Sequence, residues 1–247
     1  MTLHDARTQE LAARLAAVRQ RIEVAAGNRS QPTLIVVTKF HPAADVLRLR
    51  SLGVADVGEN RDQEAAAKAV DVADAVLRWH FIGQLQSNKA KSVASYAHSV
   101  HSIDRASLVK SLGKAMAVTQ QESGRSNMEC FIQVDLSEPY PGLAQAQVAS
   151  HSGRGGVAPQ DIAPLAELIA GTAGLDLAGV MAVAPLGVAP EPAFELLAQV
   201  SAALIANHPG ATGISAGMSH DLEAAMAVGA THLRVGSDIL GPRPPVL

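Results

Sequence analysis

The chain has 247 residues, of which 48% are hydrophobic, and a formal net charge of −3. This length suits one large α/β domain or two small ones, and no block of like charge indicates a nucleic-acid or membrane-surface partner. No apolar stretch reaches the roughly 18 residues of a membrane-spanning helix, and charged residues interrupt the N-terminal segment where a signal peptide has its apolar core. The lone cysteine, Cys130, cannot form an internal disulfide, which suits a reducing compartment. We therefore expect a cytoplasmic protein.

The first predicted element is a helix at the N-terminus. Leu11, Leu15, Val18 and Ile22 recur at the spacing of one helix face, and Asp5 is a residue type that caps helix starts. The Gly- and Pro-containing stretch that follows is expected to end this helix.

Strand-like and helix-like runs then alternate along the chain. The strands are expected to begin near Leu34, Val54, Trp79, Ser99, Glu129, Asp176, Thr212 and His232. Most are followed by a helical pattern, which predicts parallel strands joined by crossover helices. Eight such units fit a (β/α)8 barrel, the TIM-barrel fold of typically about 250 residues, here with an extra N-terminal helix. A doubly wound open sheet is the alternative, although no Gly-x-Gly-x-x-Gly turn follows the first strand.

One region interrupts this alternation. Residues 137–159 are rich in Gly, Pro and Ser and have no apolar period, and we interpret them as a long loop above the fifth strand. Residues 185–192 form a shorter loop of the same kind. Because the alternation resumes after each, neither is interpreted as a linker, and residues 1–247 are predicted to form a single domain.

Polar residues follow several of the predicted strands. Lys39 ends the first strand, Asn60 follows the second, and Ser219 and Ser237 follow the seventh and the eighth. In a closed barrel these strand ends form one face, phosphate commonly binds after strands seven and eight, and strand eight adjoins strand one. A lysine whose environment favours the free amine forms a Schiff base with an aldehyde. An aldehyde that carries a phosphate describes pyridoxal 5′-phosphate (PLP).

Each of these residues also has a simpler structural interpretation. Ser219 and Asn60 are residue types that cap helices, and Gly236 can serve only a tight turn. Arg234 is a candidate for a surface ion pair, and Lys39 taken alone is expected to be solvated. Independent explanations give no reason for all of these residues to gather on one face, so we favour a ligand site.

Two other chemistries are less well supported. GISAG at 213–217 matches the Gly-x-Ser-x-Gly pattern of a hydrolase nucleophile. An α/β-hydrolase needs an Asp and a His on later strands, and too little chain follows Ser215 to supply them. The nine histidines and one cysteine include no His-x-x-x-His or clustered Cys/His spacing, so we predict no zinc site.

With these residues in hand, the chain resembles the YggS/PROSC family of PLP-binding proteins, also called PLP homeostasis proteins. The resemblance covers most of the chain, from about Leu11 to Arg243. Its most specific blocks are VTK at 37–39, GEN at 58–60 with QE at 63–64, HFIGQLQSNK at 80–89, GMSHDLE at 217–223 and RVGS at 234–237. Because all five blocks occur in the same order as in the family, chance does not explain the resemblance.

This resemblance implies a single (β/α)8 barrel like the N-terminal domain of alanine racemase, with PLP held as an aldimine. It implies that Lys39 is the aldimine lysine and that Asn60 and Met218 lie near the cofactor. The residues that it places around the phosphate are Ser219, Arg234, Gly236 and Ser237.

The chain departs from the family's usual pattern in three places. Phe40 and His41 follow the lysine where small or basic residues are more usual. Arg61 and Asp62 occupy a position often held by an aromatic-aliphatic pair, and residues 137–156 are longer and richer in Gly than in many members. These changes bear on the rim of the pocket and on any partner contact there.

The resemblance also implies a protein that buffers and delivers PLP, with PLP-dependent apo-enzymes as recipients. A barrel-type PLP racemase needs a second acid–base group opposite the lysine, usually a Tyr from another domain, and no second domain is expected after the eighth unit. Of the two tyrosines, Tyr96 is expected on the helix after strand three, away from that face, and Tyr140 lies in the long loop. We therefore favour a monomeric carrier without catalytic turnover over an amino-acid racemase. A phosphate-binding barrel enzyme without PLP is the third alternative.

Overall fold

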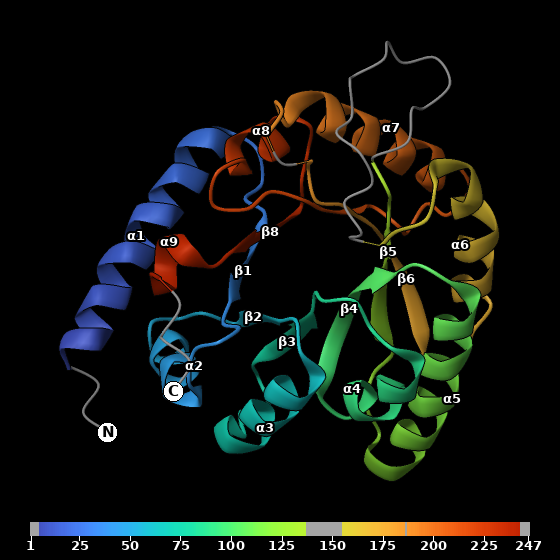
Figure 1. The fold of residues 1–247 in the computed structure, drawn as a ribbon, viewed down its shortest axis with the longest axis horizontal. Helices are drawn as coiled ribbons and strands as arrows, with labels where there is room; N and C mark the ends of the chain where they lie inside the picture. The colour runs from blue at the N-terminus through green and yellow to red at the C-terminus, as the bar shows by residue number, and fades with distance from the viewer. Residues whose placement is uncertain (1–4, 137–154, 186, 243–247) are drawn as a thin grey trace.

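The computed structural model describes residues 5–136, 155–185 and 187–242. Within these residues, eight parallel strands follow one another around a closed barrel, and β8 pairs with β1. Figure 1 shows the strands near the centre with helices arranged around them. The predicted (β/α)8 barrel is confirmed, and the open doubly wound sheet is excluded because the sheet has no free edge.

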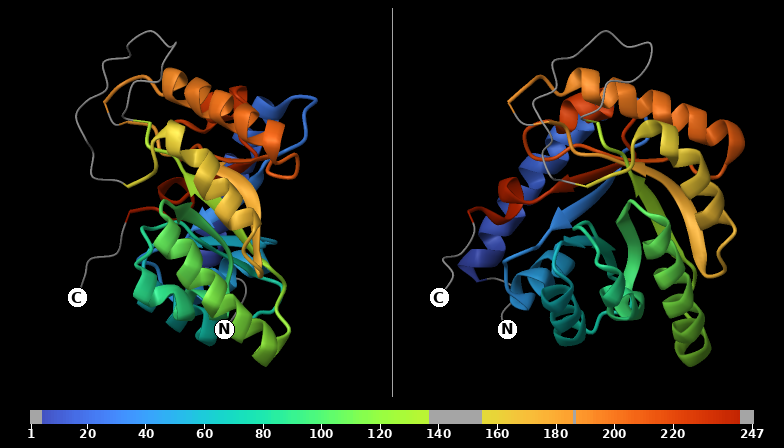
Figure 2. Two further views of the ribbon diagram at one scale, coloured as in Figure 1. Left: turned by 90° about the vertical axis from the view of Figure 1, so that its right-hand side faces the viewer. Right: turned by 45° about the vertical axis from the view of Figure 1, so that its right-hand side comes forward.

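The elements follow the predicted alternation. The strands are β1 Thr33–Val37, β2 Asp56–Glu59, β3 Arg78–Phe81, β4 Ala97–Ile103, β5 Met128–Gln133, β6 Leu175–Met181, β7 Gly213–Ser215 and β8 His232–Val235. The helices are α1 Ala6–Ala26, α2 Ala43–Ser51, α3 Asp62–Val72, α4 Ala90–Tyr96, α5 Ala106–Ser123, α6 Ile162–Ala170, α7 Glu191–Asn207, α8 Leu222–Ala227 and α9 Ser237–Leu240, with short 3-10 turns at Ser87–Lys89 and Pro159–Asp161. Figure 2 shows α5, α6 and α7 side by side on one flank of the barrel, where each contacts the next.

The N-terminal helix α1 covers the part of the barrel where β8 meets β1. The carboxylate of Asp5 caps it by accepting from the Thr8 amide at 2.7 Å, and its predicted apolar face, including Leu11 and Leu15, is buried. The helix packs against α2, α8 and α9. Because α9 has only four residues, α1 occupies the position that a full-length eighth helix would take.

The interior of the barrel is unusually polar. Bulky apolar side chains normally fill this space, whereas Ser99, His101 and Ser215 are fully buried here. The hydrogen bond between His101 on β4 and Ser215 on β7 crosses the barrel, because these strands are not neighbours. Phe131 stacks on His101 with ring centroids 4.3 Å apart, and Gly213 makes room for it, since a Cβ there would lie 2.6 Å from the Phe131 ring.

The loops differ in how far they can be described. The loop expected over 137–159 lies mostly outside the described residues; at its end, Val157 forms an isolated parallel bridge with Val134, and Gln133 Nε2 donates to the Gly155 carbonyl at 2.9 Å. In the described part of the chain, no helix combines the length and apolar character that crossing a membrane requires.

Candidate functional site

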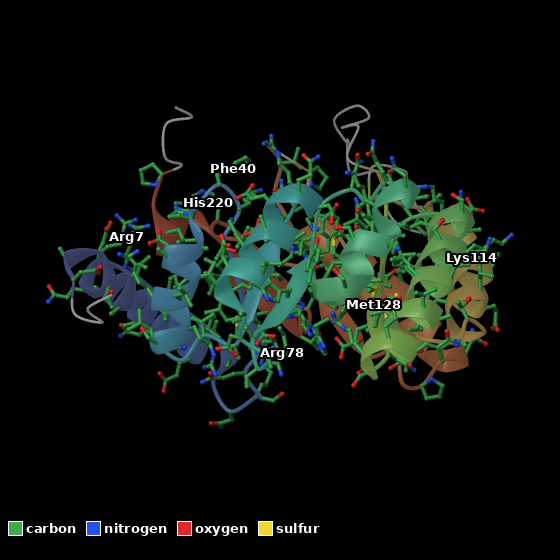
Figure 3. All side chains as sticks on the ribbon, turned by 90° about the horizontal axis from the view of Figure 1, so that it is seen from below. Arg7, Phe40, Arg78, Lys114, Met128 and His220 are labelled. Atoms are coloured by element: carbon green, nitrogen blue, oxygen red, sulfur yellow. The ribbon has the colours of Figure 1, made fainter. Side chains whose placement is uncertain are left out.

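A cavity of about 270 Å³ lies at the C-terminal ends of β1, β7 and β8. Its lining consists of Val37, Lys39, Phe40, His41, Ile82, Met218, Ser219, His220, Arg234, Gly236, Ser237 and Gly241. Every residue predicted for the site is in this lining except Asn60. Barrel closure explains the grouping, because the pairing of β8 with β1 brings the two ends of the chain together. Figure 3 shows the labelled Phe40 and His220 close together at one edge of the molecule.

Lys39 lies in the turn that follows β1. The predicted strand extended to Lys39, but β1 ends at Val37. The Thr38 amide still donates to a β2 carbonyl, and the His41 amide then donates back to the Thr38 carbonyl at 3.1 Å. The next residue, Phe40, has a φ of 69°, a left-handed conformation that costs a non-glycine residue about 1–3 kcal/mol. The turn places Lys39 in the cavity lining.

Two contacts from the start of α3 stabilise the unusual conformation of Phe40. The Phe40 amide donates to Glu64 Oε1 at 2.6 Å. The Arg61 guanidinium carbon lies 4.9 Å from the centre of the Phe40 ring, within the range of a cation–π contact. Phe40 and Arg61 are both departures from the family's usual pattern, and the structure shows that these two departures contact each other at the rim of the pocket.

A buried ionic cluster adjoins the Lys39 turn. Lys68 Nζ donates to Glu59 Oε1 at 2.7 Å and to Glu64 Oε1 at 2.6 Å. It also donates to the Thr38 carbonyl at 2.9 Å, while the Thr38 hydroxyl donates to Glu59 Oε1 at 2.6 Å. Burial raises the pKa of Glu59, and the charge of Lys68 opposes that shift. The cluster fixes the residue before Lys39; sequence reasoning missed Lys68, although its i, i+4 spacing from Glu64 is a known signal.

Asn60 follows β2 and is not part of the cavity lining. It does not cap α3, whose N-cap is Arg61. Gly83 passes close by, since a Cβ there would lie 2.2 Å from the Asn60 carbonyl oxygen. The side-chain Oδ1 of Asn60 is buried and has no hydrogen-bond partner among the described residues. A buried acceptor of this kind has an unmet hydrogen bond, and its predicted place near a ligand remains a prediction.

The loops after β7 and β8 bring two serine hydroxyls together. Ser219 Oγ and Ser237 Oγ lie 3.2 Å apart. Gly217 allows the first loop to turn, because its φ of 90° favours glycine. The loop is held by a hydrogen bond of 2.5 Å from the Met218 amide to Asp221 Oδ1. Since the N-cap of α8 is Asp221, Ser219 does not have the capping role that was the simpler interpretation.

Arg21 on α1 connects these two loops. Its Nη2 donates to the Ser219 carbonyl at 3.1 Å, and its Nη1 donates to Asp238 Oδ2 at 2.8 Å. The same guanidinium makes two hydrogen bonds to the Glu223 carboxylate, at 2.8 and 2.9 Å. Sequence reasoning missed Arg21, because an arginine on the polar face of a helix carries no local sign of such contacts.

Arg234 reaches the cavity from β8, and its guanidinium is anchored inside the barrel. Nη1 donates to the Ser215 carbonyl at 2.7 Å and to Ser215 Oγ at 2.6 Å, and Nη2 donates to the Ala182 carbonyl at 2.8 Å. Burial lowers the pKa of Arg234 to about 10, with Asp221 opposing the shift, so it remains a cation near neutral pH. It is only 5% exposed, which rules out a surface ion pair. Its role at a phosphate remains a prediction.

The other residues considered from the sequence lie elsewhere. Ser215, in the Gly-x-Ser-x-Gly pattern, is fully buried in the barrel beside His101 and is not in the cavity lining. Tyr96 lies at the end of α4, where its hydroxyl donates to Asp62 Oδ1 at 3.4 Å and burial raises its pKa. Tyr140 is outside the described residues. No group of His, Cys, Asp or Glu side chains within the described ranges could hold a metal ion.

Comparison with known proteins adds relatives of similar length. Residues 13–244 match the family model described as alanine racemase, N-terminal domain. The chain is 39% identical over 230 residues to the pyridoxal phosphate homeostasis protein of Corynebacterium glutamicum, which covers 91% of this chain and 98% of that protein. The protein of the same name from Mycobacterium leprae is 36% identical over 257 residues, with 97% and 95% covered.

Solved structures lead to the same group of proteins. Two structures of PipY from Synechococcus elongatus, one without PLP and one with PLP bound, are 32% and 31% identical to this chain; both have a TM-score of 0.75 and cover 94% of this chain and 100% of PipY. Alanine racemase from Corynebacterium glutamicum is 13% identical to this chain, with a TM-score of 0.67. The matched region covers 97% of this chain and 62% of the racemase chain, and this likeness shows a shared fold alone. On its sequence, its barrel and these relatives, the chain belongs to the pyridoxal phosphate homeostasis protein family, the YggS/PROSC family.

Proposed function

We propose that the cavity binds PLP and that this protein holds the cofactor for intracellular PLP homeostasis and delivery. The observation that carries the proposal is one cavity shared by Lys39, Ser219 and Ser237. A primary amine and a pair of hydroxyl donors suit the aldehyde and the phosphate of one small ligand. Relatives named pyridoxal phosphate homeostasis protein, and the PipY structure with PLP bound, support the same ligand.

The residues present fit this ligand. The cavity of about 270 Å³ is close to the lower end of the range for small-molecule sites, about 300–1,000 Å³. The hydroxyls of Ser219 and Ser237, 3.2 Å apart, can both donate to one phosphate, and the buried Arg234 cation supplies positive charge. Asn60 lies outside the cavity lining, and its buried Oδ1, which has no hydrogen-bond partner among the described residues, is an available acceptor. When bound, PLP supplies an aldehyde and an electron-withdrawing ring.

The residues have distinct proposed roles. Lys39 binds the aldehyde carbon through Nζ as a Schiff base, with the release of one water molecule. The proposed phosphate contacts are Ser219, Arg234, Gly236 and Ser237, and the proposed neighbours of the ring are Asn60 and Met218. The ionic cluster around Lys68 supports Lys39 by fixing the backbone at Thr38.

We propose that the protein carries PLP without turnover of amino acids. Apart from Lys39, the side chains of the cavity lining that carry an imidazole are His41 and His220. His41 is buried and its pKa is lowered by that burial, whereas His220 is exposed. A racemase needs a second base in a closed site that protects the carbanion from water. The exposed His220 is not shielded from water, so among the described lining residues His41 is the shielded imidazole, and His41 and Tyr140 are the residues to test for the racemase alternative. The carrier proposal is supported by relatives named pyridoxal phosphate homeostasis protein.

The test combines a spectrum with an assay for racemisation. The PLP-loaded protein should show a visible absorption band and should pass PLP to an apo-enzyme. Incubation with L- and D-alanine, serine and glutamate, followed by chiral chromatography, should show no steady racemisation. Multiple-turnover racemisation that disappears in both Lys39→Ala and Tyr140→Phe would mean that the protein is a racemase and that Tyr140 supplies the second base.

We also propose that residues 1–247 act as one domain, that the protein is a cytoplasmic monomer and that PLP-dependent apo-enzymes receive its cofactor. The net charge of −3 supports the absence of a nucleic-acid partner. Light scattering of the purified protein should give the mass of one chain, 25.6 kDa, and twice that mass would contradict the monomer.

A further inference from the structure

A chain of buried polar side chains runs through the barrel from the cavity to the opposite face. Its members come from β8, β7, β4, β3 and β2. The side chains of Ser99, His101 and Ser215 have no exposed surface, and His80 is 2% exposed. A polar side chain in such a core needs a hydrogen-bond partner, and apolar residues normally fill this space. The packing of the core therefore does not explain why these buried polar side chains are present.

The upper part of the chain begins at the cavity-lining Arg234. Its Nη1 donates to Ser215 Oγ at 2.6 Å. Ser215 Oγ lies 2.8 Å from His101 Nδ1, and His101 Nε2 lies 2.9 Å from Ser99 Oγ. Ser99 Oγ in turn lies 2.7 Å from His80 Nδ1. These links form one continuous path along the inside of the barrel.

The lower part of the chain reaches solvent at the N-terminal face of the barrel. His80 Nε2 lies 2.9 Å from Asp56 Oδ1. Asp56 makes two hydrogen bonds of 2.6 Å with Arg78, which begins β3 and is 48% exposed. Figure 3 shows Arg78 at the edge of the molecule opposite Phe40 and His220. The path therefore connects the cavity with the far end of the barrel.

The cavity end of the chain determines the direction of its first hydrogen bonds. Arg234 has no acceptor atom, so Ser215 Oγ accepts from it. The Ser215 hydroxyl hydrogen has one acceptor among the described residues, His101 Nδ1, which must then be the unprotonated nitrogen of the ring. Burial lowers the pKa of His101 well below its usual value, and nearby His80 and Arg234 lower it further, so the ring is neutral. His101 therefore carries its proton on Nε2, which faces Ser99.

The hydrogen bond between His80 and Asp56, at the other end of the path, runs in the same direction, away from the cavity. Burial acts to raise the pKa of Asp56, but hydrogen bonds from His80 and Arg78 outweigh this and hold it below its usual value. The ionised carboxylate only accepts, so His80 carries its proton on Nε2, and burial lowers the pKa of this ring as well. The Nε2–H of His101 has two acceptors in reach, Ser99 Oγ at 2.9 Å and His80 Nδ1 at 3.0 Å. His80 Nδ1 therefore accepts either from Ser99, at 2.7 Å, or directly from His101. From Arg234 down to Asp56 the donors point away from the cavity, Arg78 donates to Asp56 from the opposite end, and both rings are neutral Nε2–H tautomers.

We propose that Ser215 and His101 are positioning residues that hold the Arg234 guanidinium in the cavity, and that the chain down to Asp56 fixes their hydrogen-bond directions. The proposal rests on the proposed function, since it has Arg234 facing bound PLP. Three of the five N–H groups of Arg234 are engaged by Ser215 and Ala182, which leaves two for a ligand. Without the Ser215 hydroxyl, both Arg234 Nη1 and His101 Nδ1 lose a partner, and the guanidinium is held only by the carbonyls of Ser215 and Ala182.

Nitrogen NMR of the ligand-free protein reads the tautomers directly. In protein labelled with ¹⁵N at histidine, near neutral pH, His80 and His101 should both appear as neutral rings protonated at Nε2. The variants His80→Gln and His101→Gln assign the signals. A charged ring, or a ring protonated at Nδ1, at His101 would overturn the proposed direction of the chain, whether or not PLP binds.

Titrations with PLP test the positioning role. Ser215→Ala should bind PLP about 10-fold more weakly, which corresponds to about 1.4 kcal/mol. The same change should cause no further loss in an Arg234→Met background, because Ser215 acts only through Arg234. His101→Gln keeps a donor and an acceptor and should retain more affinity than His101→Phe. His98→Phe, on the same strand, is the control: the His98 ring lies 5.9 Å from that of His80 but makes none of the hydrogen bonds of the path, so this variant should bind PLP as the wild type does.

The outcomes separate this proposal from the proposed function. Wild-type affinity in Ser215→Ala, or losses that add fully in the double variant with Arg234→Met, would overturn the positioning role. If His101→Phe does not fold, Ser215→Ala and the tautomer measurement still decide the question. A wild-type protein that does not bind PLP would overturn the proposed function and this role together, while the tautomers would still establish the chain.

Discussion

Arg21 on the N-terminal helix donates a hydrogen bond of 3.1 Å to the carbonyl oxygen of Ser219, 198 positions later in the chain. The same guanidinium pairs with Asp238 on α9 at 2.8 Å. Ser219 lies in the loop after β7, and Asp238 lies next to Ser237 at the start of α9; the hydroxyls of Ser219 and Ser237 meet in the cavity. The extra helix therefore supports the candidate phosphate site as well as covering the barrel.

Replacing Arg21 should weaken the binding of the phosphate group selectively. We expect Arg21→Met to reduce PLP affinity about fivefold, in line with the roughly 1 kcal/mol of a partly exposed ion pair, and to leave pyridoxal affinity nearly unchanged. Fluorescence titrations with both ligands measure this difference. Arg19→Met is the matched control, because Arg19 lies on the same helix but donates to the Leu52 and Gly53 carbonyls. Equal losses for both ligands would contradict the specific link to the phosphate.

Lys39 should be the residue that binds PLP covalently. Lys39→Ala should remove the visible absorption band and leave the fold intact, because the side chain is only partly buried at the mouth of the barrel. Lys89→Ala and Lys91→Ala should keep the band. Borohydride reduction followed by peptide mass spectrometry locates the attached group, and its recovery on a peptide without Lys39 would contradict the assignment.

Arg234 should contribute to phosphate binding through its charge. A hydrogen bond from a charged donor is worth about 1.5–3 kcal/mol, so Arg234→Met should weaken PLP binding about 10- to 100-fold, whereas pyridoxal should bind both proteins nearly equally. Thermal denaturation should also show a loss of stability, because the acceptors on Ser215 and Ala182 lose their donor. If both ligands lose affinity alike, Arg234 faces another part of the ligand or supports the fold alone.

The free energy of unfolding should fall as the pH is lowered from about 7 to about 5. Burial lowers the pKa of His80, His101 and His232, the last to about 4, whereas an unfolded histidine titrates near 6.5. The unfolded chain then binds more protons, so stability present above about pH 6.5 is lost toward lower pH, by about 1.4 kcal/mol per pH unit for each such group. The raised pKa of Glu59 acts in the opposite sense.

Urea unfolding at a series of pH values measures this slope. His232→Gln removes one of the three groups and should make the slope shallower. A free energy of unfolding that stays constant between about pH 7 and pH 5 would show that the buried rings titrate as they do in the unfolded chain, and it would contradict the prediction.

Local patterns were enough to predict the barrel and most of its candidate site. Each strand begins within two residues of its predicted start, because strands buried on both faces leave compact apolar runs that can be read without knowing their neighbours. Lys39, Ser219 and Ser237 were predicted on one face because the C-terminal ends of parallel strands in a closed barrel must lie together. Asn60 was placed on the same face because it follows the second strand, and the resemblance put it near the cofactor, but the cavity lining does not contain it.

The supporting contacts could be seen only in three dimensions. His101 and Ser215 are 114 positions apart and lie on strands that are not neighbours. Arg21 and Ser219 are 198 positions apart, and no residue near Arg21 in the sequence indicates that they are in contact. The tilt and stagger of the strands set which side chains meet inside a barrel, and the packing of α1 sets which loops its arginines reach. A sequence pattern reports burial and backbone geometry because these depend on nearby residues, whereas the partner of a buried hydrogen bond depends on how distant segments pack.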